Sequence, residues 1–386
     1  MKITGIIAEY DPLHRGHAYH LRRAREITGA DCIVVALGGF FTQRGAPALF
    51  DKFARAEMAL RCGADAVVEL PQVYASRPAE LFALGGVDTL DALGCDCLCF
   101  GCEIDEMDRL FALQAEKKRL DGELRPLLLA NLKQGKSYPR AAGEALESAG
   151  VQARLLKEPN LILALEYLGA IQQLSSRMVP FAVKRSAPYH AQAGETESAS
   201  AIRALIASGR WEEALSALPP DCAKICADEG QDGLCASARL DAYILTRLRE
   251  TPPGQAASCE EDSLVNRLLR LSRQSAGVEE LTELVKCKRY TRARISRLIT
   301  ELCLALPKAP GRVPYLHLLG ARKDADFLLK ELSRRARLPL HSGASGLMDS
   351  ELFQAECRAA DLWGLSTAKA EYRRAGRELT HKFLRV

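Results

Sequence analysis

The chain has 386 residues, of which 48% are hydrophobic and 26% are charged, so it is long enough for two or three domains with a substantial buried core. Its formal net charge is only +4, from 53 basic and 49 acidic side chains. This near balance excludes a protein that binds polyanions through its overall charge, and any nucleic-acid partner would have to meet a local basic patch.

The sequence is expected to belong to a reduced, cytoplasmic protein with no membrane partner. Glu9 and Asp11 lie where a secretion signal would continue its apolar region. The longest apolar run, CIVVALGGFF, has ten residues, against roughly 18 needed to span a bilayer. The 13 cysteines are odd in number and irregularly spaced, which argues against a disulfide framework.

The first two hundred residues alternate short apolar runs with helical patterns. Strands are predicted at residues 2–8, 32–37, 66–70, 97–100 and 179–184. Helices are predicted between them, at 17–28, 52–62, 78–93 and, as a pair, within 106–150. Continuous apolar strands separated by helices predict a parallel sheet covered on both faces. Ligands bind such sheets beyond the carboxyl ends of the strands, so the loops after Ala8, Leu37, Phe100 and Lys184 are the expected positions of a site.

From about residue 205 helical patterns predominate and strand signals are few. Helices are predicted at 234–250, 260–275, 278–286, 290–306, 322–336 and 350–378. The sequence therefore predicts an α/β protein, in which a Rossmann-like parallel-sheet domain over residues 1–205 precedes an all-helical domain over residues 206–386.

The stretch GIIAEYDPLHRGHAYHL, residues 5–21, contains the most informative motif. A strand ending at Ala8 turns through Pro12 and enters a helix near Gly16, where unpaired N–H groups and the helix dipole favour an anion, typically a phosphate. Gly16 leaves the backbone uncovered, and the imidazoles of His14 and His17 can donate hydrogen bonds to phosphate oxygens. This pattern predicts displacement at an α-phosphate. The alternative is that His17 is an ordinary first-turn residue and His14 an exposed loop residue.

Four closely spaced cysteines, Cys95, Cys97, Cys99 and Cys102, invite comparison with a zinc site. Alternate residues of a strand point to one face, and a second C-x-x-C turn is absent from the sequence. We therefore predict buried strand cysteines and no metal bound by the protein.

The segment KCKRYTRARISR, residues 286–297, contains six basic residues and no acidic one. An apolar stripe at helical spacing should face the core, and it consists of Ile295, Leu298, Ile299, Leu302 and Leu306. Arg294 and Arg297 should then point away from the core, with Tyr290 available to stack on a base. The segment is either a solvated face or an RNA contact made mainly through phosphates.

Several blocks of sequence, taken together, resemble the bacterial tRNA(Met) cytidine acetate ligase family. GIIAEYDPLHRGH contains the H-x-G-H signature of the nucleotidylyltransferase superfamily, which is related to class I aminoacyl-tRNA synthetases. FTQRGAPALFDKFARAEMAL, GADAVVELP, LCFGCE and VKRSAPYH follow it in order, and KRYTRARISRL and PYLHLLG extend the resemblance into the second half. The chain departs from the family pattern at Asp11, Leu13, Arg15 and Phe40. A carboxylate at Asp11 beside a triphosphate would need Arg15 or a magnesium ion to offset it.

The resemblance implies a two-step ligase. ATP and acetate would form acetyl-adenylate, with Mg²⁺ on the phosphates, and the acetyl group would pass to N4 of the wobble cytidine of elongator tRNA(Met). DNA is not an implied partner. His14 and His17 would be the catalytic residues. The implied ATP-binding residues are Ile7, Ala8, Glu9, Tyr10, Asp11, Pro12, Leu13, His14, Arg15, Gly16, His17, Ala18, Tyr19, His20, Gly101, Asn160, Arg185, Ser200 and Arg203. The tRNA-binding residues would be Lys286, Lys288, Arg289, Tyr290, Arg294 and Arg297.

Within this set, Gly101 would let the nucleotide lie against bare backbone, and Asn160 would cap a helix as well as bind the ligand. Arg185 would neutralise phosphate charge. Ser198 or Ser200 would cap the following helix, from which Arg203 could reach the pyrophosphate leaving group. Two other functions remain open: a nucleotidylyltransferase that adenylates a small phosphate ester, and a nucleotide-regulated RNA-binding protein without turnover.

Overall fold

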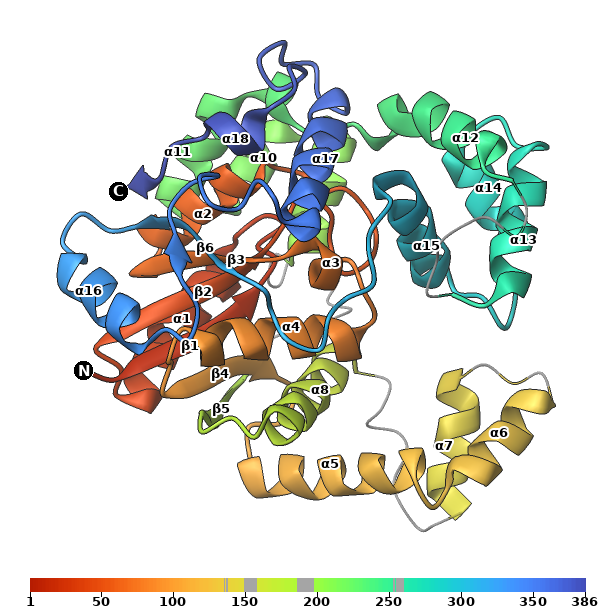
Figure 1. Cartoon of the computed structure of the whole chain (residues 1–386), viewed down its shortest axis with the longest axis horizontal. Helices are drawn as coiled ribbons and strands as arrows, with labels where there is room; N and C mark the ends of the chain where they lie inside the picture. The colour runs from red at the N-terminus through yellow and green to blue at the C-terminus, as the bar shows by residue number, and fades with distance from the viewer. Residues whose placement is uncertain (135, 137, 149–157, 186–197, 253, 255–259) are drawn as a thin grey trace.

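A single eight-stranded sheet lies at the centre of the computed structural model, which describes residues 1–134, 136, 138–148, 158–185, 198–252, 254 and 260–386 (Figure 1). The strands are β1 (Ile3–Ala8), β2 (Cys32–Gly38), β3 (Ala66–Leu70), β4 (Cys97–Cys102), β5 (Val179–Lys184), β6 (Leu316–Ala321), β7 (Leu340–His341) and β8 (Leu384–Arg385). Their order is β5-β4-β1-β2-β3-β6-β7, with β8 also paired to β6. The first five strands run parallel, and β6 is antiparallel to β3. The five strands predicted from the sequence are confirmed.

Most of the predicted helices are present with shifted ends, but the one predicted over 350–378 ends at residue 365, and a separate short helix covers 377–380. In the first half they are α1 (Arg15–Thr28), α2 (Lys52–Arg61), α3 (Gln72–Ala75), α4 (Ala79–Ala92), α5 (Met107–Asp121), α6 (Arg125–Lys133), α7 (Tyr138–Ser148) and α8 (Pro159–Leu174). Next come α9 (Ala199–Ala207), α10 (Trp211–Ser216), α11 (Pro220–Glu229), α12 (Asp241–Glu250), α13 (Asp262–Ser272) and α14 (Val278–Val285). The last are α15 (Arg292–Leu304), α16 (Asp326–Arg335), α17 (Glu351–Leu365) and α18 (Arg377–Thr380). The pair predicted within 106–150 is three helices.

Both faces of the sheet are buried, as the uninterrupted apolar strands predict. Along β2, Ile33 and Val35 belong to a core cluster with α1 and α2, whereas Val34 and Ala36 belong to a second cluster with α4 and α8. The cysteines of β4 are buried and free, as is Cys95 just before it. This confirms their assignment as core residues.

The region after residue 205 differs from the all-helical domain that the sequence predicts, because it contributes β6, β7 and β8 to the sheet. The run LHLLGA of β6 is fully buried, and a six-residue apolar run cannot be distinguished from a buried helical turn by periodicity. Strands β7 and β8 have two residues each, too few for a pattern. Helices α12, α13 and α15 also join the core cluster that contains α1 and α2.

The order of the strands creates a topological switch point at the middle of the sheet. From β1 the chain builds β2 and β3 on one side, and it then returns to build β4 and β5 on the other. The order therefore reverses between β1 and β4, and the chain segments that leave these strands diverge there. The loop after β1 carries the H-x-G-H motif, so the fold places this motif at the switch point.

Arg55 of α2 fixes the carboxyl ends of β1 and β2. Its side chain is fully buried and donates to the carbonyl oxygens of Phe50 (3.0 Å), Glu9 (2.6 Å), Gly38 (3.1 Å) and Gly39. Burial lowers the pKa of Arg55, and the nearby carboxylates of Asp11, Asp51 and Glu9 oppose this shift. The guanidinium thus satisfies carbonyls that the last residues of both strands would otherwise leave unpaired.

We predict that Arg55→Met lowers the free energy of unfolding by about 3 kcal/mol or more, because four buried carbonyls lose their donor. Urea denaturation followed by circular dichroism measures this loss. The matched control is Arg61→Met on the same helix, whose exposed pair with Glu57 should contribute little. Equal losses in the two variants would contradict the role given to Arg55.

Candidate active site

His14 and His17 together close the amino-terminal end of α1. His14 is the N-cap residue, and its Nδ1 accepts a hydrogen bond from the Gly16 N–H at 3.0 Å. The Nδ1 atom of His17 accepts from the His14 N–H at 3.4 Å, and the ring centroids lie 3.9 Å apart. This reciprocal pair is a capping box made of imidazoles. It starts the helix at Arg15, two residues before the predicted start.

The capping box also fixes where each imidazole carries its proton. Because both Nδ1 atoms accept backbone N–H bonds, the proton of each neutral ring lies on Nε2. Burial, with smaller effects from Arg185 and Arg203, lowers the pKa of His14 to about 4. Burial and the neighbouring His14 lower the pKa of His17 well below its usual value. At neutral pH the motif therefore presents two neutral Nε2–H donors.

Gly16 is required by the cap itself. A Cβ at this position would lie 2.8 Å from Cε1 of His14, closer than side-chain carbon atoms approach each other. Any other residue would push the His14 ring out of the position from which it caps α1. The sequence predicts a glycine here so that a phosphate can approach the backbone. The packing of the His14 ring is a second reason for a glycine at position 16.

Asp11 is neutralised by Arg203 of α9. The Nη1 atom of Arg203 donates to the Asp11 carbonyl at 2.5 Å and lies 3.5 Å from its carboxylate Oδ2. The other carboxylate oxygen, Oδ1, accepts from the Leu49 N–H at 2.6 Å. Arg15, expected as a partner of Asp11, instead donates to the Ser216 carbonyl at 2.8 Å. The carboxylate is thus a structural link between the H-x-G-H loop and α9.

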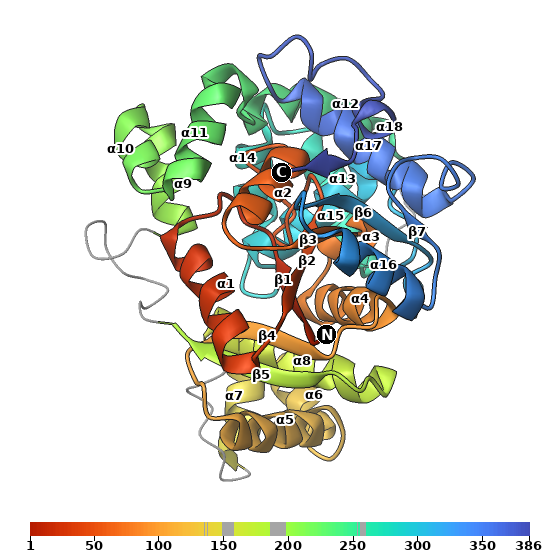
Figure 2. The same cartoon turned by 90° about the vertical axis from the view of Figure 1, so that its left-hand side faces the viewer.

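The start of α9 matches one of the two predicted caps. Ser198 is the N-cap residue, and its side chain accepts from the Ala201 N–H at 3.2 Å. Ser200 lies one turn before Arg203 and accepts from its Nη2 at 3.2 Å. Arg203 is therefore held between Ser200 and Asp11. Figure 2 shows its helix, α9, beside the amino-terminal end of α1.

Arg185 brings a second guanidinium to the switch point. It follows β5, and its backbone N–H donates to the Cys102 carbonyl at the end of β4. Its side chain passes over Gly101, whose Cβ position would lie 3.6 Å from Cγ of Arg185. The positive charge of Arg185 contributes to the lowered pKa of His14, His17 and His20. Its Nε atom is buried and has no hydrogen-bond partner among the residues that the structure describes.

Asn160 does not cap α8, which corrects the prediction. The N-cap residue is Glu158, and Asn160 lies inside the first turn. Its Nδ2 donates to Glu103 Oε1 at 2.6 Å, just beyond the end of β4. This contact holds Asn160 beside the end of β4, and the side chain of the N-cap residue Glu158 makes no capping hydrogen bond.

Other members of the stretch from Ile7 to His20 serve the core. Tyr10 and Leu13 are buried, and the Tyr10 ring lies 5.0 Å from that of His17. His20 approaches Cys99, with Nε2 3.7 Å from Sγ, and burial lowers its pKa to about 4. Phe40 is also buried and packs against Trp363. These residues pack in the core next to the site.

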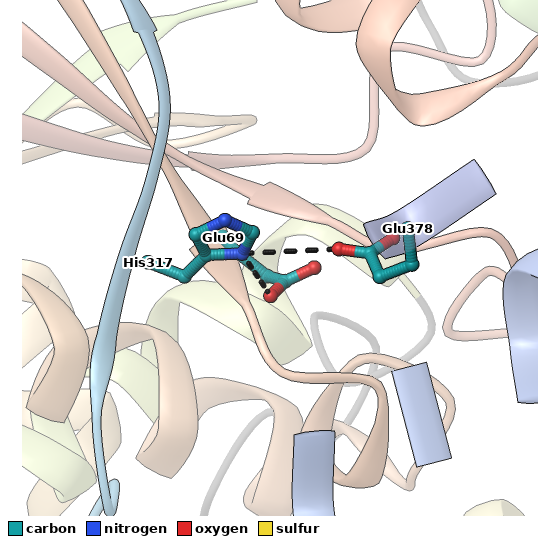
Figure 3. Close-up of side chains that lie close together, drawn as sticks. All are labelled: Glu69, His317 and Glu378. Carbon is teal, nitrogen blue, oxygen red and sulfur yellow. Dashed lines mark hydrogen bonds and ion pairs between the residues drawn. The ribbon is translucent and has the colours of Figure 1, made fainter. Parts of the chain in front are cut away.

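A buried charged cluster lies beside the site, at the carboxyl end of β3. Possible ligand atoms of Glu69, His317 and Glu378 lie within 4.8 Å of one another (Figure 3). The ammonium group of Lys52 already occupies a cation position here, bonded to Glu69 and, at 2.7 Å, to Glu378. Glu356 is 3.9 Å from the same ammonium group. The cluster therefore carries its own cation.

The charges in this cluster are unequal. Burial raises the pKa of Glu69, but Lys52 and His317 outweigh it and lower the value to about 2. Burial, reinforced by Glu69, raises the pKa of Glu356 well above its usual value, so we assign a proton to Glu356. The sequence alone assigns no role to any member of this cluster. Isolated charges within apolar runs such as AVVEL were the available signal.

The basic run of residues 286–297 is largely paired with acidic side chains. Arg294 pairs with Glu260 at 2.7 Å, Arg289 with Glu261, and Arg292 with Glu279 and Glu283. Tyr290 is buried and its hydroxyl group lies 3.0 Å from that of Ser263, so its ring is not available to a base here. The apolar stripe of α15 is buried as predicted.

Arg297 differs from the rest of the run. It is half-buried beside a cavity of about 370 Å³ that Arg77, Glu260 and Glu301 also line. Its Nη1 atom reaches the Gln43 carbonyl at 3.4 Å. The expectation that Arg297 points into solvent is therefore corrected, because the loop after β2 packs against α15.

Comparison with known proteins assigns the chain to a family. The model of the HIGH nucleotidyl transferase family matches residues 1–378. A tRNA(Met) cytidine acetate ligase of a Thermoanaerobacter species is 32% identical over 404 residues, covering 100% of both chains. The chain belongs to this ligase family. The tRNA(Met) cytidine acetate ligase of Syntrophotalea carbinolica is 36% identical over 361 residues. This alignment covers 89% of the present chain and 85% of the Syntrophotalea chain.

Solved structures extend the likeness to three dimensions. Thermotoga maritima TmcAL bound with alpha-thio ATP is 30% identical, covers 100% of both chains and has a TM-score of 0.90. The apo form of the same protein has a TM-score of 0.91. The α/β nucleotidylyltransferase fold predicted from the sequence is thereby confirmed. Across the described ranges, every helix falls short of the length and apolar character that a bilayer crossing demands.

We predict that stability falls as the pH is lowered through the window between 6.5 and about 4, because the unfolded chain binds a proton at His14 that the folded chain excludes. For His14 alone the loss is at most about 3 kcal/mol. His14→Asn keeps a capping acceptor and should flatten this dependence. Urea denaturation at stepped pH measures the slope for both proteins, and identical slopes would refute the assignment.

Proposed function

We propose that this protein activates acetate with ATP as acetyl-adenylate and transfers the acetyl group to N4 of the wobble cytidine of elongator tRNA(Met), giving N4-acetylcytidine. Family membership and the names of the relatives support the overall reaction. The observation that carries the proposal is the pair of Nε2–H donors at the start of α1, in a chain that shares its fold with a protein bound to alpha-thio ATP.

In the first step, an acetate oxygen attacks the α-phosphorus of ATP and pyrophosphate leaves. The Nε2–H groups of His14 and His17 donate to phosphate oxygens as negative charge builds on them, and the N-terminal dipole of α1 adds to this attraction. Arg185 and Arg203 supply the fixed positive charge. Because both imidazoles are held by backbone hydrogen bonds before ATP arrives, little reorganisation is needed in the transition state.

Magnesium, when bound, would neutralise phosphate charge. We propose that the phosphates and water molecules hold it rather than a protein carboxylate. Asp11 is committed to Arg203 and the Leu49 N–H, and Glu9 accepts from the Gln43 N–H. Mg²⁺ commonly keeps several waters and relies on substrate phosphates, which fits this arrangement.

In the second step, the exocyclic amine of the cytidine attacks the acetyl carbonyl carbon, and AMP leaves. The wobble base must be unstacked to reach the adenylate. We propose that residues 1–205 carry the ATP site and that the helices within residues 206–386 hold the tRNA, in the cytoplasm. The basic run supports this assignment through its exposed members, Lys286, Lys288 and Arg289, although phosphates would have to compete with the paired glutamates.

Incubation with labelled acetate, ATP and bulk tRNA tests the proposal. Acetate-dependent label in tRNA is the expected result. Pyrophosphate release without labelled tRNA would favour adenylation of a small phosphate ester, and tRNA retention on a filter without either signal would favour a nucleotide-regulated RNA-binding protein. The assay thus separates the proposed ligase from both alternatives.

We predict that His17→Ala reduces acetyl-adenylate formation at least about 100-fold, because one donor to the developing charge is lost. Binding of tRNA should be unchanged, since the residue is remote from the basic run. Acetate-dependent exchange of labelled pyrophosphate into ATP measures the first effect and filter binding the second. The control His341→Ala should retain activity. Normal exchange in the His17 variant would show that the site is misassigned.

We predict the opposite pattern when the exposed residues Lys286 and Lys288 are both changed to Gln. The affinity for tRNA should fall about tenfold or more and depend less steeply on salt, because phosphate contacts are lost. Adenylate formation should persist. Arg334→Gln on α16, an exposed arginine paired with Glu331, serves as the control. Unchanged tRNA affinity in the double variant would remove this surface from the proposal.

A further inference from the structure

Two thiols from distant parts of the sequence meet beside the H-x-G-H loop. Cys62 ends α2, and Cys222 lies in the first turn of α11, 160 positions later. Their Sγ atoms are 3.4 Å apart. A disulfide requires about 2.05 Å, so the two sulfurs need to approach by only about 1.4 Å to form one.

The two cysteines have complementary environments. Cys62 is half-buried and therefore partly accessible to an oxidant, whereas Cys222 is buried. The hydrogen bond from Cys222 lowers the pKa of Cys62, which favours the thiolate that attacks an oxidant. The same contact, together with burial, raises the pKa of Cys222. Cys62 is therefore suited to react first and Cys222 to resolve the product.

The pair joins two segments that both hold the candidate active site. Helix α2 carries Arg55, which fixes the end of β1. The segment α9–α11 supplies Arg203 to Asp11 and the Ser216 carbonyl to Arg15. Tyr10 of the H-x-G-H loop is close enough to both thiols for their charge to affect its pKa, which burial already raises. A covalent bond here would tie α11 to α2 next to this loop.

We propose that Cys62 and Cys222 form a redox modification site, which closes to a disulfide with a hydroperoxide and reopens with a thiol reductant. The Cys62 thiolate attacks one peroxide oxygen, the O–O bond breaks, and the products are a sulfenic acid at Cys62 and, after protonation, one water. The Cys222 sulfur then attacks the Cys62 sulfur, the S–O bond breaks, and a second water leaves. Two sulfurs are each oxidised by one electron, and one hydrogen peroxide is reduced to two waters.

The test treats the full-length protein with hydrogen peroxide, then denatures it and alkylates the remaining thiols. The treated protein should lose the alkyl groups of Cys62 and Cys222, and proteolysis should yield a linked peptide that contains both cysteines. Dithiothreitol should restore both groups. Cys222→Ala should reduce the linked peptide at least tenfold. The matched control is Cys226→Ala, one turn further along α11 and also buried, which should leave the link intact.

The proposal is overturned if peroxide converts Cys62 to a sulfinic acid without a link, or if the link forms between other cysteines. It is also overturned if Cys226→Ala abolishes the link as completely as Cys222→Ala. Cys287, which is exposed, reports in the same digest that the oxidant was active. Because the readout counts thiols, it does not depend on the proposed ligase activity, and the two proposals fail independently.

Discussion

The reciprocal hydrogen bonding of His14 and His17 is the interaction on which the candidate site depends. One pair of bonds starts α1, holds two imidazole rings side by side and leaves the Nε2–H of each ring as a donor. The strand order places this helix start at the switch point of the sheet. Helix capping and ligand binding are therefore two uses of the same side chains, and Gly16 is fixed by the space that the His14 ring needs.

The basic side chains at this edge of the sheet are of two kinds, those enclosed by buried acceptors and those close to the two histidines. Arg55 is saturated by backbone carbonyls, and Lys52 is surrounded by Glu69, Glu356 and Glu378. Both are inaccessible, and they hold strands and the C-terminal segment together. Arg185 and Arg203 lie nearer the histidines and lower the pKa of His14. A neutral imidazole next to fixed guanidinium groups suits a polyphosphate, because the cations attract it and the imidazoles bind its oxygens directionally.

The two halves of the chain share one hydrophobic core and one sheet. Residues after 205 share a core with α1 and α2 and extend the sheet beyond β3. The loop after β2 is held by α15, since the Gly45 carbonyl accepts from Ser296 at 2.8 Å and from Thr300 at 2.7 Å. A Cβ on Gly45 would lie 2.3 Å from the backbone of Arg297. Movement of the helices that we propose to hold tRNA is thus connected physically to a loop at the carboxyl edge of the sheet.

The sequence by itself determined the five parallel strands, most helices and the motif at the end of β1. These features follow from local patterns: continuous apolar runs for two-sided burial, and a histidine-glycine turn between a strand and a helix. Only the tertiary structure decided that β6 extends the sheet, that Tyr290 is buried, and that Arg203 rather than Arg15 faces Asp11. Each of these features depends on contacts between residues far apart in the chain. The sequence alone does not distinguish a charged or aromatic side chain that faces solvent from one that contacts a buried group.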